Sequence, residues 1–367
     1  MDYPMPRSHG FDPPAGLRSH EGLVRLRHGQ DAHLVTRYAD VRAVLRDHAR
    51  FSSDPSRPGY PQLRPVVDKK AAPGSFLVTD PPLHTRYRRL LTGEFTVRRM
   101  EALRPEIERI THARLDAMLA GPQPADLVAG FAMPVPSDVI CLLLGVPPED
   151  QEFFSSRSRA HHDRTRSAAE VQAALDELHD YIRALLPGQG LLKRLSEALT
   201  EDEVVGMVVL LLVGGHETTA NSIAMSVLAL ADQWATLRPS DVDGAVEELL
   251  RYLSPVHQGV VRAVTSDGDG MRAGDGVIAS LFAANRDPSV YPDPDVLDIR
   301  RKARGHLAFG DGVHQCLGQT LARVEMRVAL RALLERAPGL RVAVPFEEVR
   351  FRFDAPICGL YELPVTW

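Results

Sequence analysis

The chain has 367 residues, of which 44% are hydrophobic and 25% are charged, and this usage excludes a disordered or fibrous protein. Its 43 lysines and arginines against 48 aspartates and glutamates give a formal net charge of −5, which argues against nucleic acid as a main partner. A chain of this length can bury a large core without disulfide bonds. The three cysteines, Cys141, Cys316 and Cys358, lack the spacing of a metal clip, and we expect a reducing cytosol.

No segment of the sequence predicts export or membrane insertion. Residues 1–16 are polar and rich in proline, without the apolar stretch of a signal peptide. The longest apolar run, residues 204–215, is shorter than the ~20 residues that cross a bilayer. The chain is therefore expected to be soluble and cytoplasmic.

The first quarter of the chain combines short strands with one amphipathic helix. Residues 33–36 resemble a strand, and a helix is expected from about Ala39, where Val41, Val44 and Leu45 share one face. The proline-rich residues 52–80 follow. So long an irregular segment indicates a functional loop or a disordered one.

From Asp80 to Leu250 the pattern is mostly helical. Asp80 is an N-cap followed by prolines, and Pro105 is expected in the first turn of a later helix. The residues 200–203 form a capping box, and the helix that they begin should run to about Trp234, a length of roughly 50 Å. The other expected helices cover residues 103–119, begin near residue 137 and cover residues 172–186.

Beyond Leu253 the pattern changes. Residues 260–281 are β-like and are broken by turns rich in glycine and aspartate. A final helix is expected over residues 317–337, and short strands close the chain. No linker or repeat divides the sequence. The fold class is therefore mainly α with a smaller β region, in a single domain over residues 1–367.

The densest motif is FGDGVHQCLG at residues 309–318, where a cysteine lies between a glycine-rich loop and the expected start of a helix. Unpaired backbone N–H groups and the positive end of the helix dipole stabilise a thiolate there. The glycines let the loop turn tightly and let a flat ligand approach the backbone. Such a thiolate suits iron, because N–H donors to the sulfur tune the metal potential. An isolated cysteine would instead indicate a buried packing residue.

The spacing Phe309-x-x-Gly312-x-His314-x-Cys316-x-Gly318 resembles the haem-ligand loop of the cytochrome P450 family, in its soluble bacterial form. Three further motifs occur in the family's order, so the resemblance covers nearly the whole chain. It implies the cytochrome P450 fold, with haem b (iron protoporphyrin IX) between the long central helix and the cysteine loop. It also implies Cys316 as the iron ligand.

The second motif is GGHETT at residues 214–219, inside the longest expected helix. Glycines inside a helix cost about 1 kcal/mol each relative to alanine, so Gly214 and Gly215 indicate room for a planar cofactor rather than a helix distorted by packing. The Thr218 hydroxyl can bond back to the Gly214 carbonyl. A zinc-protease motif is excluded, because Ala220 stands where that motif requires histidine. The resemblance implies that Glu217 and Thr218 pass protons to bound oxygen.

The third motif is Glu248-x-x-Arg251, whose two side chains share a helix face. Taken alone, it would indicate a surface ion pair worth a few tenths of a kcal/mol. The resemblance implies instead a structural pair that holds the loop leading to the cysteine. Its third partner is expected within residues 297–306, where we choose Arg301, although this segment lacks the family's frequent phenylalanine.

The fourth motif is His84 and Arg88, whose spacing places both on one helix face, ready to pair with two carboxylates. Because arginines 86 and 89 are close by, a solvated basic face is the alternative. The resemblance implies that His84 and Arg88 bind the haem propionates. Arg262 and His314 match two more propionate partners.

Together these motifs imply a haem–thiolate monooxygenase that uses O2 to hydroxylate or epoxidise a bulky apolar small molecule, such as a secondary metabolite. A peroxygenase, an oxidative coupling enzyme and a non-enzymatic haem sensor are the alternatives, and the presence of both Glu217 and Thr218 argues against the first two. Two electrons must come from another protein, since three cysteines cannot hold a four-cysteine iron–sulfur cluster and no flavin or nicotinamide fingerprint is present.

A ferredoxin and its reductase are therefore the expected partners. The ferredoxin should dock on arginines near the cysteine, against the alternative of an ordinary solvated face: Arg89, Arg98, Arg99 and Arg323. By resemblance, residues 52–80 and 153–174 form an access lid over the substrate. The expected pocket lining is small or aliphatic: Leu210, Val213, Gly214, Val256 and Val260.

Overall fold

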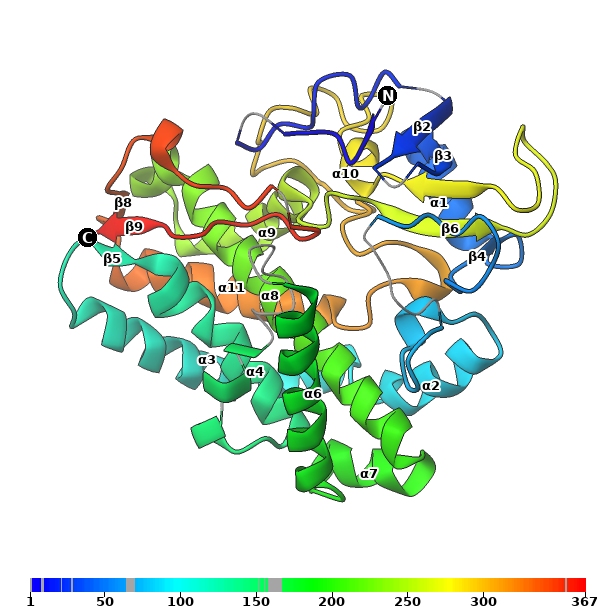
Figure 1. The fold of residues 1–367 in the computed structure, drawn as a ribbon. Helices are drawn as coiled ribbons and strands as arrows, with labels where there is room; N and C mark the ends of the chain where they lie inside the picture. Colours follow the sequence, from blue (N-terminus) through cyan, green and yellow to red (C-terminus); the bar gives the residue numbers. More distant parts are fainter. Residues whose placement is uncertain are drawn as a thin grey trace. The chain divides into compact units, whose positions relative to one another are not determined.

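The computed structural model describes residues 2–7, 10–20, 22–27, 29–63, 70–150, 152–154, 156–157, 167–353 and 355–367. These residues form two compact units (Figure 1). Unit 1 comprises residues 1–90 and 247–317, and unit 2 comprises residues 91–246 and 318–367. Each unit is assembled from two stretches that are far apart in the sequence, so neither corresponds to a continuous half of the chain.

Unit 1 is built on a six-stranded mixed sheet. The strand order is β1-β2-β3-β7-β6-β4, in which β1 pairs parallel to β2 and β3 pairs parallel to β7. The strands are β1 (Asp2–Tyr3), β2 (Gly22–Leu26), β3 (Asp31–Val35), β4 (Phe51–Ser52), β6 (Val260–Val264) and β7 (Gly276–Ala279). The predicted strand at residues 33–36 is confirmed as part of β3.

Helix α1 (Tyr38–Arg46) packs on this sheet. Val41, Val44 and Leu45 are buried against side chains of β4, β6 and β7, so the predicted apolar face is confirmed. The other helical elements of unit 1 are short or shared with unit 2: η1 (Phe76–Val78), α2 (Leu83–Thr92), α9 (Val242–Leu253), α10 (Leu281–Ala284) and η6 (Gly312–His314).

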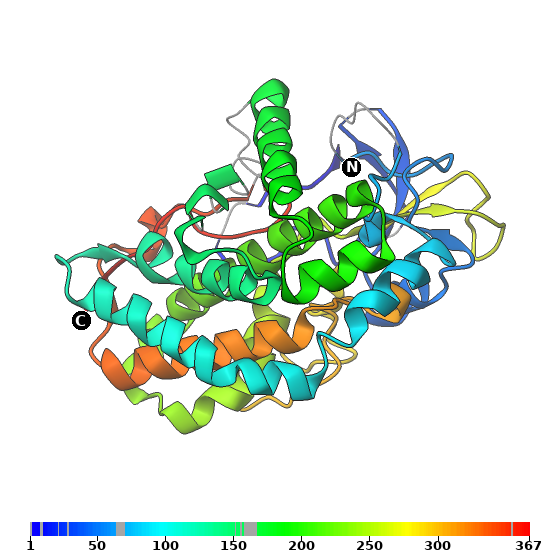
Figure 2. The same ribbon diagram turned by 90° about the horizontal axis from the view of Figure 1, so that it is seen from below.

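Unit 2 is mainly helical. Its long helix α8 (Glu201–Ala229) packs against α4 (Pro134–Leu144), α6 (Ala168–Leu185) and α11 (Gln319–Arg336). Helix α3 (Val97–Leu119) runs alongside α11, as Figure 2 shows for the cyan and orange helices. The remaining elements are α7 (Gly190–Ala198), η2 (Val128–Ala132), η3 (Pro148–Asp150), η4 (Ala231–Thr236), η5 (Pro239–Asp241), η7 (Phe346–Glu348) and a small sheet of β5 (Ala125–Asp126), β9 (Pro364–Thr366) and β8 (Arg341–Val342).

The capping box of α8 is confirmed, because the Thr200 side chain accepts from the Glu203 N–H and the Glu203 carboxylate accepts from the Thr200 N–H. The prediction that this helix reaches Trp234 is wrong. It ends at Ala229, and the chain tightens into η4, where buried Trp234 donates its indole N–H to the Ala337 carbonyl at 3.2 Å. A tertiary hydrogen bond therefore decides the end of the helix.

The expected start of α3 is also wrong. The helix begins at Val97 behind an N-cap, Thr96, so Pro105 lies in its interior rather than in its first turn. Both Pro105 and the residue one turn before it, Glu101, are exposed. Solvent can therefore hydrate the carbonyl group that the missing proline N–H leaves without its helical bond.

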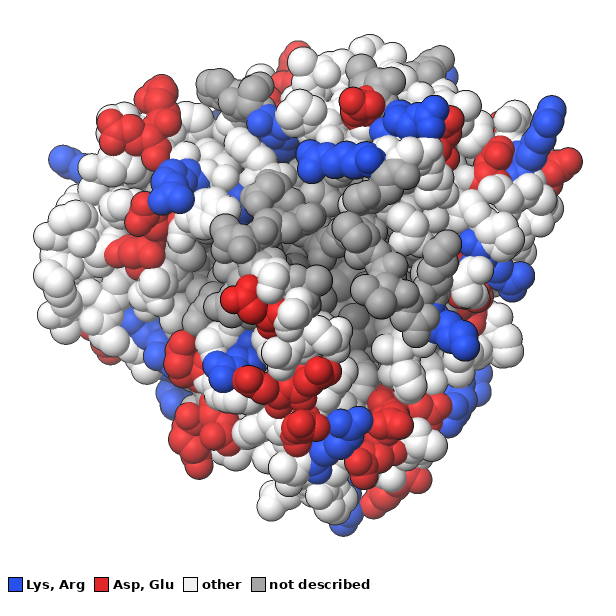
Figure 3. Space-filling view, viewed as in Figure 1, with Lys and Arg blue, Asp and Glu red and all other residues white. Residues whose placement is uncertain are grey.

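By length and composition, α8 is the one helix among the described residues that could cross a bilayer. Within the apolar window that passes this test, 61% of the residues are buried inside the chain, as in the core helix of a soluble protein. On the face seen in Figure 3, basic and acidic side chains of the described residues are interspersed, in agreement with the small net charge.

Candidate functional site

In unit 1 the cysteine loop is a tight turn held by its own backbone. Gly310 and Gly312 adopt positive φ angles of 68° and 72°, and a Cβ at Gly312 would lie 2.4 Å from the Leu45 carbonyl oxygen. The Cys316 N–H donates to the Phe309 carbonyl at 2.8 Å. The Cys316 thiol is exposed, whereas Cys141 and Cys358 are buried. The loop therefore presents one accessible sulfur at a defined position.

The loop leads directly into α11, which begins at Gln319 with Gly318 as its N-cap residue. The Gly318 carbonyl accepts the first helical bond, from the Ala322 N–H at 2.9 Å. The expected start near Leu317 is thus two residues early. The thiol precedes the helix N-terminus by three residues, where backbone N–H groups and the helix dipole favour a thiolate.

The structure brings the side chains of His84, Arg88, Arg262 and His314 together in unit 1. The rings of His84 and His314 lie 4.2 Å apart between centroids, and His314 Nε2 is 2.9 Å from the Ser53 hydroxyl oxygen. Arg88 donates to the Gln315 carbonyl, next to the cysteine. Arg262 is 6% exposed and is held by its own neighbour, the Val261 carbonyl, at 2.7 Å.

Burial and neighbouring positive charges lower the pKa of both histidines in this cluster. Burial, together with the charge of Arg88, lowers the pKa of His84 from 6.5 to about 4. Burial, Arg262 and His84 lower the pKa of His314 to about 2. Both imidazoles are therefore neutral at pH 7, because burial and the neighbouring arginine charges disfavour their protonation.

The cluster fits the carboxylates of a haem. His84 is 2% exposed, and neither of its ring nitrogens has a hydrogen-bond partner among the described residues. Buried Arg262 has no acidic ion-pair partner within the described part of the chain. A buried donor without a partner is costly, and two negatively charged groups would satisfy this set. The donors and the exposed thiol together suit an iron porphyrin with two propionates.

We expect the haem-free chain to lose stability as the pH falls from 7 towards 4. The unfolded chain protonates its histidines near pH 6.5, whereas folded His84 takes a proton only near pH 4, so the unfolded state binds more protons across this window. The measurement is the urea midpoint at pH 7.0 and 5.5, compared with a His84→Gln variant in which this contribution is absent. Equal pH slopes in the two proteins would contradict the assignment.

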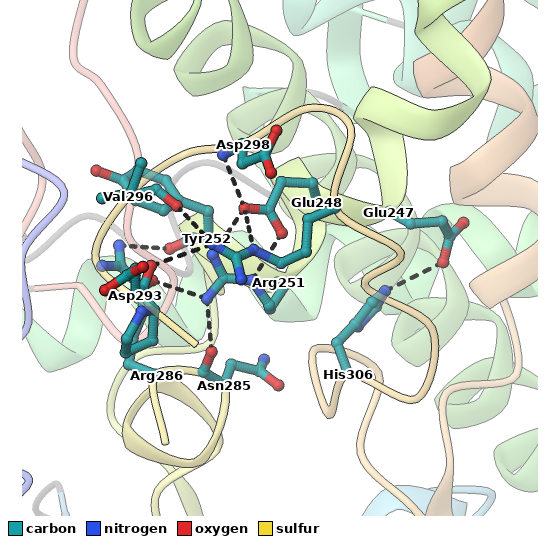
Figure 4. Close-up of polar contacts among 12 residues, drawn as sticks. Glu247, Glu248, Arg251, Tyr252, Asn285, Arg286, Asp293, Val296, Asp298 and His306 are labelled. Carbon is teal, nitrogen blue, oxygen red and sulfur yellow. Dashed lines mark hydrogen bonds and ion pairs between the residues drawn. The ribbon is translucent and has the colours of Figure 1, made fainter. Parts of the chain in front are cut away.

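The Glu248–Arg251 pair is buried in unit 1 and is not the surface pair that spacing alone would indicate. Both side chains are 0% exposed. Arg251 Nε and Nη2 donate to the two carboxylate oxygens of Glu248 at 2.7 and 2.8 Å (Figure 4). Arg251 Nη1 donates to the carbonyls of Asn285 and Pro294 at 2.8 and 2.9 Å. The arginine therefore ties α9 to two later segments of the chain.

Arg301 is the third member of this cluster. Its Nε donates to Glu248 Oε1 at 3.1 Å, and its other nitrogens donate to the carbonyls of Pro292, Asp293 and Val296. The Asp298 N–H also donates to Glu248 Oε1, at 3.1 Å. Glu248 therefore accepts from two arginines and one backbone amide.

Asn285 connects the cluster to the cysteine loop, and the sequence analysis missed it. Its Oδ1 accepts from the Leu307 N–H at 2.6 Å, and its Nδ2 donates to the Ser254 hydroxyl at 2.8 Å. Leu307 lies two residues before Phe309. The one local signal is a run of polar residues, Asn285 to Asp287, directly after the apolar α10.

In unit 2, α8 carries the second motif. The Thr218 hydroxyl donates to the Gly214 carbonyl at 2.9 Å, and Ser222 donates in the same way to the Thr218 carbonyl at 2.8 Å. A Cβ at Gly214 would meet nothing within 4 Å, so this glycine leaves open space beside the threonine. A Cβ at Gly215 would lie 3.0 Å from Ile140 Cδ1 of α4. Close packing of α4 is therefore a second reason for a glycine at position 215, and the cofactor role of both glycines stays a prediction.

Glu217 is 1% exposed, and its carboxylate points to an arginine that the sequence analysis did not find. Arg352 Nη2 lies 2.7 Å from Glu217 Oε1. Arg352 sits in a C-terminal turn in which its N–H donates to the Gly359 carbonyl at 2.8 Å, and a Cβ at Gly359 would collide with Asn221 of α8 at 1.9 Å. The acid is thus held from the C-terminal segment rather than left beside Thr218 alone.

The remaining candidates are spread over both units. Leu210 and Val213 are half-buried on α8, and Val256 and Val260 are half-buried against the core of unit 1. Of the two expected lid stretches, residues 64–69, 155 and 158–166 lie outside the described residues. The arginines differ in their partners: Arg99 pairs with Glu94 at 2.7 Å, Arg323 donates to Gln319, and Arg89 and Arg98 are exposed.

Known proteins resemble this chain over its whole length. A family model described as cytochrome P450 matches residues 242–340. Cytochrome P450-SU2 of Streptomyces griseolus is 48% identical over 92% of this chain and 88% of its own, and the vitamin D3 dihydroxylase of the same organism is 44% identical over 100% and 96%. The crystal structure of a mycinamicin VIII C21 methyl hydroxylase from Micromonospora griseorubida, bound to mycinamicin VIII, has 41% identity and a TM-score of 0.90 over 100% of both chains.

These comparisons confirm the predicted fold, mainly helical with a smaller sheet region. They also set aside the non-enzymatic sensor, because relatives at this identity include enzymes such as the vitamin D3 dihydroxylase. At such identity over its full length, and with Glu248, Arg251 and Cys316 placed as described, this chain belongs to the cytochrome P450 family of haem-dependent monooxygenases.

Proposed function

We propose that this enzyme inserts one oxygen atom from O2 into a bulky apolar small molecule, by hydroxylation or epoxidation, in the tailoring of a secondary metabolite in the cytoplasm. The observation that carries the proposal is the exposed Cys316 thiol close in the chain to His314, which joins half-buried Arg88 and buried His84 and Arg262 in one cluster of donors. A haem b bound through Cys316, with its propionates on His84, Arg88, Arg262 and His314, would supply the activation of O2. The chain's own residues hold the cofactor, move protons and exclude water.

Proton delivery is proposed for Thr218 and Glu217 on α8. The Thr218 hydroxyl is half-exposed and already donates to the Gly214 carbonyl, beside the open space that Gly214 leaves. It can therefore turn from the carbonyl to a bound oxygen molecule and donate its proton there. Once its contact with Arg352 loosens, the Glu217 carboxylate can take a proton from water and pass it to that hydroxyl. Positioned proton transfer of this kind is worth roughly 10²- to 10⁴-fold in rate.

Replacing Thr218 with alanine should leave haem binding intact and divert reducing equivalents to peroxide or water. Because the variant lacks the proton donor and keeps the cofactor residues of unit 1, we expect the product formed per NADPH consumed to fall by about tenfold or more. The measurement compares product, peroxide and NADPH in the same reaction.

Thr219→Ala is the matched control for this variant. Thr219 is the next residue of α8 and bonds back to the Gly215 carbonyl in the same way, but it is buried. Thr219→Ala should couple like the wild type, and Thr218→Ser should restore much of the coupling. Unchanged coupling in Thr218→Ala would remove the proposed role.

The electrons are proposed to come from a ferredoxin and its reductase, since the described residues contain no cluster of cysteines for a redox centre. Exposed Arg89 and Arg98 are the strongest docking candidates, because Arg99 and Arg323 are engaged with Glu94 and Gln319. Product formation that needs ferredoxin, reductase and O2 supports a monooxygenase. Product formation with peroxide alone would instead indicate that the enzyme is a peroxygenase.

The substrate class rests on the half-buried aliphatic residues Leu210, Val213, Val256 and Val260. Relatives named for vitamin D3 and for mycinamicin VIII support a bulky apolar molecule. A library of terpenoids, steroids and polyketides should contain compounds that displace iron-bound water and shift the haem spectrum from low to high spin. A library without a single such compound would contradict this substrate class.

A further inference from the structure

Asp311 lies inside the cysteine loop and has no part in the function proposed above. Its Oδ2 accepts from Arg42 Nε at 2.7 Å and from Arg46 Nε at 2.9 Å, and its Oδ1 accepts from the Gly312 N–H at 2.7 Å. The carboxylate is 16% exposed. One side chain of the loop therefore gathers three donors, two of them charged.

The two arginines project from a rigid helix. Arg42 and Arg46 are one turn apart on α1, so their side chains share one face. The other face of α1, with Val41, Val44 and Leu45, is buried in the core of unit 1. The loop backbone also rests directly on the last turn of α1, since only a glycine at position 312 avoids the Leu45 carbonyl. Asp311 thus fastens the loop where the loop meets α1.

The carboxylate is ionised in this setting. Burial opposes the charge of Asp311, but hydrogen bonds from Arg42, the Gly312 N–H and Arg46 outweigh it and lower the pKa of the carboxyl group. The hydrogen bond between Arg42 and Asp311 also raises the pKa of Arg42. Hydrogen bonds that involve an ionised carboxylate are about twice as strong as hydrogen bonds between two neutral groups.

The bonds continue from Asp311 to the thiol. Asp311 precedes the short helix η6, the Gln315 N–H donates to the Gly312 carbonyl at 3.1 Å, and the Cys316 N–H donates to the Phe309 carbonyl at 2.8 Å. Displacement of Gly312 would therefore move the turn that ends at Cys316.

We propose that Asp311, held by Arg42 and Arg46, is a positioning residue that keeps the Cys316 thiolate in the geometry required to ligate iron. The inference rests on the proposed role of Cys316 as iron ligand. Residues that orient a metal ligand from outside its coordination shell commonly contribute 10- to 100-fold to affinity or activity. Asp311 is such a residue: it lies in the loop itself and is anchored by two arginines of α1.

Asp311→Asn tests the proposal, with Asp287→Asn as the matched control. Asp287 fastens the opposite end of the same helix, accepting from the Tyr38 N–H at 2.8 Å, and hydrogen bonds likewise keep its pKa low against burial. Among the described residues, the Asp287 side chain bonds to Tyr38 and Ser289 and not to the cysteine loop, so its variant reports the general cost of loosening α1. Both variants keep the shape of the side chain and remove its charge.

Two readouts separate positioning from stability. In the haem-free chain, we expect hydrogen exchange at the Gly312 and Cys316 amides to be roughly tenfold faster in Asp311→Asn and near wild type in Asp287→Asn. In the haem-bound protein, the ferrous carbonyl complex should convert roughly tenfold faster from the Soret band of thiolate ligation to that of a neutral thiol in Asp311→Asn alone.

Equal changes in exchange rate and Soret conversion in the two variants, or no change in Asp311→Asn, would overturn the proposed positioning role of Asp311. Arg42→Gln and Arg46→Gln each remove one of the two arginine bonds to Asp311. Both should change the exchange rates and the Soret conversion in the same direction but by less, and they test the proposal even if Asp311→Asn folds poorly. A wild-type protein without a thiolate-type Soret band would overturn the proposed function instead. The exchange rates of the haem-free chain would still test whether Asp311 positions the loop.

Discussion

Replacing Cys316 with serine is expected to abolish the thiolate-type Soret band of the ferrous carbonyl complex and to reduce monooxygenase activity by more than the roughly 100-fold that loss of an outer-shell partner can cost. The hydroxyl of serine is not ionised at neutral pH and does not supply the electron density that a thiolate gives to iron. The loop itself should survive, because its turn depends on Gly310, Gly312 and the bond from the residue 316 N–H to the Phe309 carbonyl. The measurements are the carbonyl spectrum and the product yield with saturating electron donors.

Cys358→Ser is the control for this substitution. Cys358 is buried in unit 2, so the change should cost some stability and leave the Soret band unchanged. A Cys316→Ser protein with the spectrum of the wild type would sink the assignment of the iron ligand. A Cys358→Ser protein without that band would sink it as well, since the ligand would then be the other cysteine.

Replacing Glu248 with glutamine is expected to destabilise the protein by about 3–5 kcal/mol, because it leaves the fully buried Arg251 guanidinium without its counter-ion. The loss falls on more than one contact, since the same carboxylate accepts from Arg301 and from the Asp298 N–H. The free energy of unfolding of a typical protein is about 5–15 kcal/mol, so a loss of this size should unfold a large fraction of the molecules at 37 °C. Urea unfolding followed by circular dichroism measures the difference.

The adjacent Glu247→Gln is the matched control. Glu247 lies on the same helix and meets His306 at 3.2 Å, but its side chain is 19% exposed against 0% for Glu248, so we expect a smaller loss of about 1–2 kcal/mol. Similar losses for the two variants would show that Glu248 has no special structural role. Arg301→Gln should fall between them, because Arg301 is partly exposed and Arg251 keeps its bidentate contact.

Local features of the chain could be predicted because their physics is local. The apolar face of α1 follows from the spacing of Val41, Val44 and Leu45, and the start of α8 follows from the reciprocal bonds of Thr200 and Glu203. Both depend on residues three or four positions apart, and helix geometry fixes such neighbours without reference to the rest of the chain.

Helix ends were less predictable. The end of α8 depends on the bond of Trp234 to Ala337, more than 100 residues later. The start of α3 at Val97 could have been found from Thr96, but Pro105 diverted the expectation to a later start. Propensity is a weak signal where a tertiary contact or solvent can satisfy the backbone group in question.

The candidate site divides in the same way. Motif spacing drew attention to Cys316, Glu248, Arg251 and Thr218, whose functional roles stay predictions. Spacing could not find Arg352, Asn285 or the two arginine partners of Asp311. Each of these contacts joins residues separated by 22 to 269 positions, and no local pattern marks them.

The amino-acid sequence by itself determined the family, the fold class, the cysteine loop and the start of the capped helix α8, because short-range spacing and a few strongly constrained residue types carry that information. Tertiary structure alone decided that Glu248 and Arg251 are buried, that Gly215 serves the packing of α4, that Glu217 faces Arg352, and that Asp311 is fastened to α1. The physical reason is that burial and ion pairing depend on which distant segments meet, and that is settled only when the core of each unit has formed.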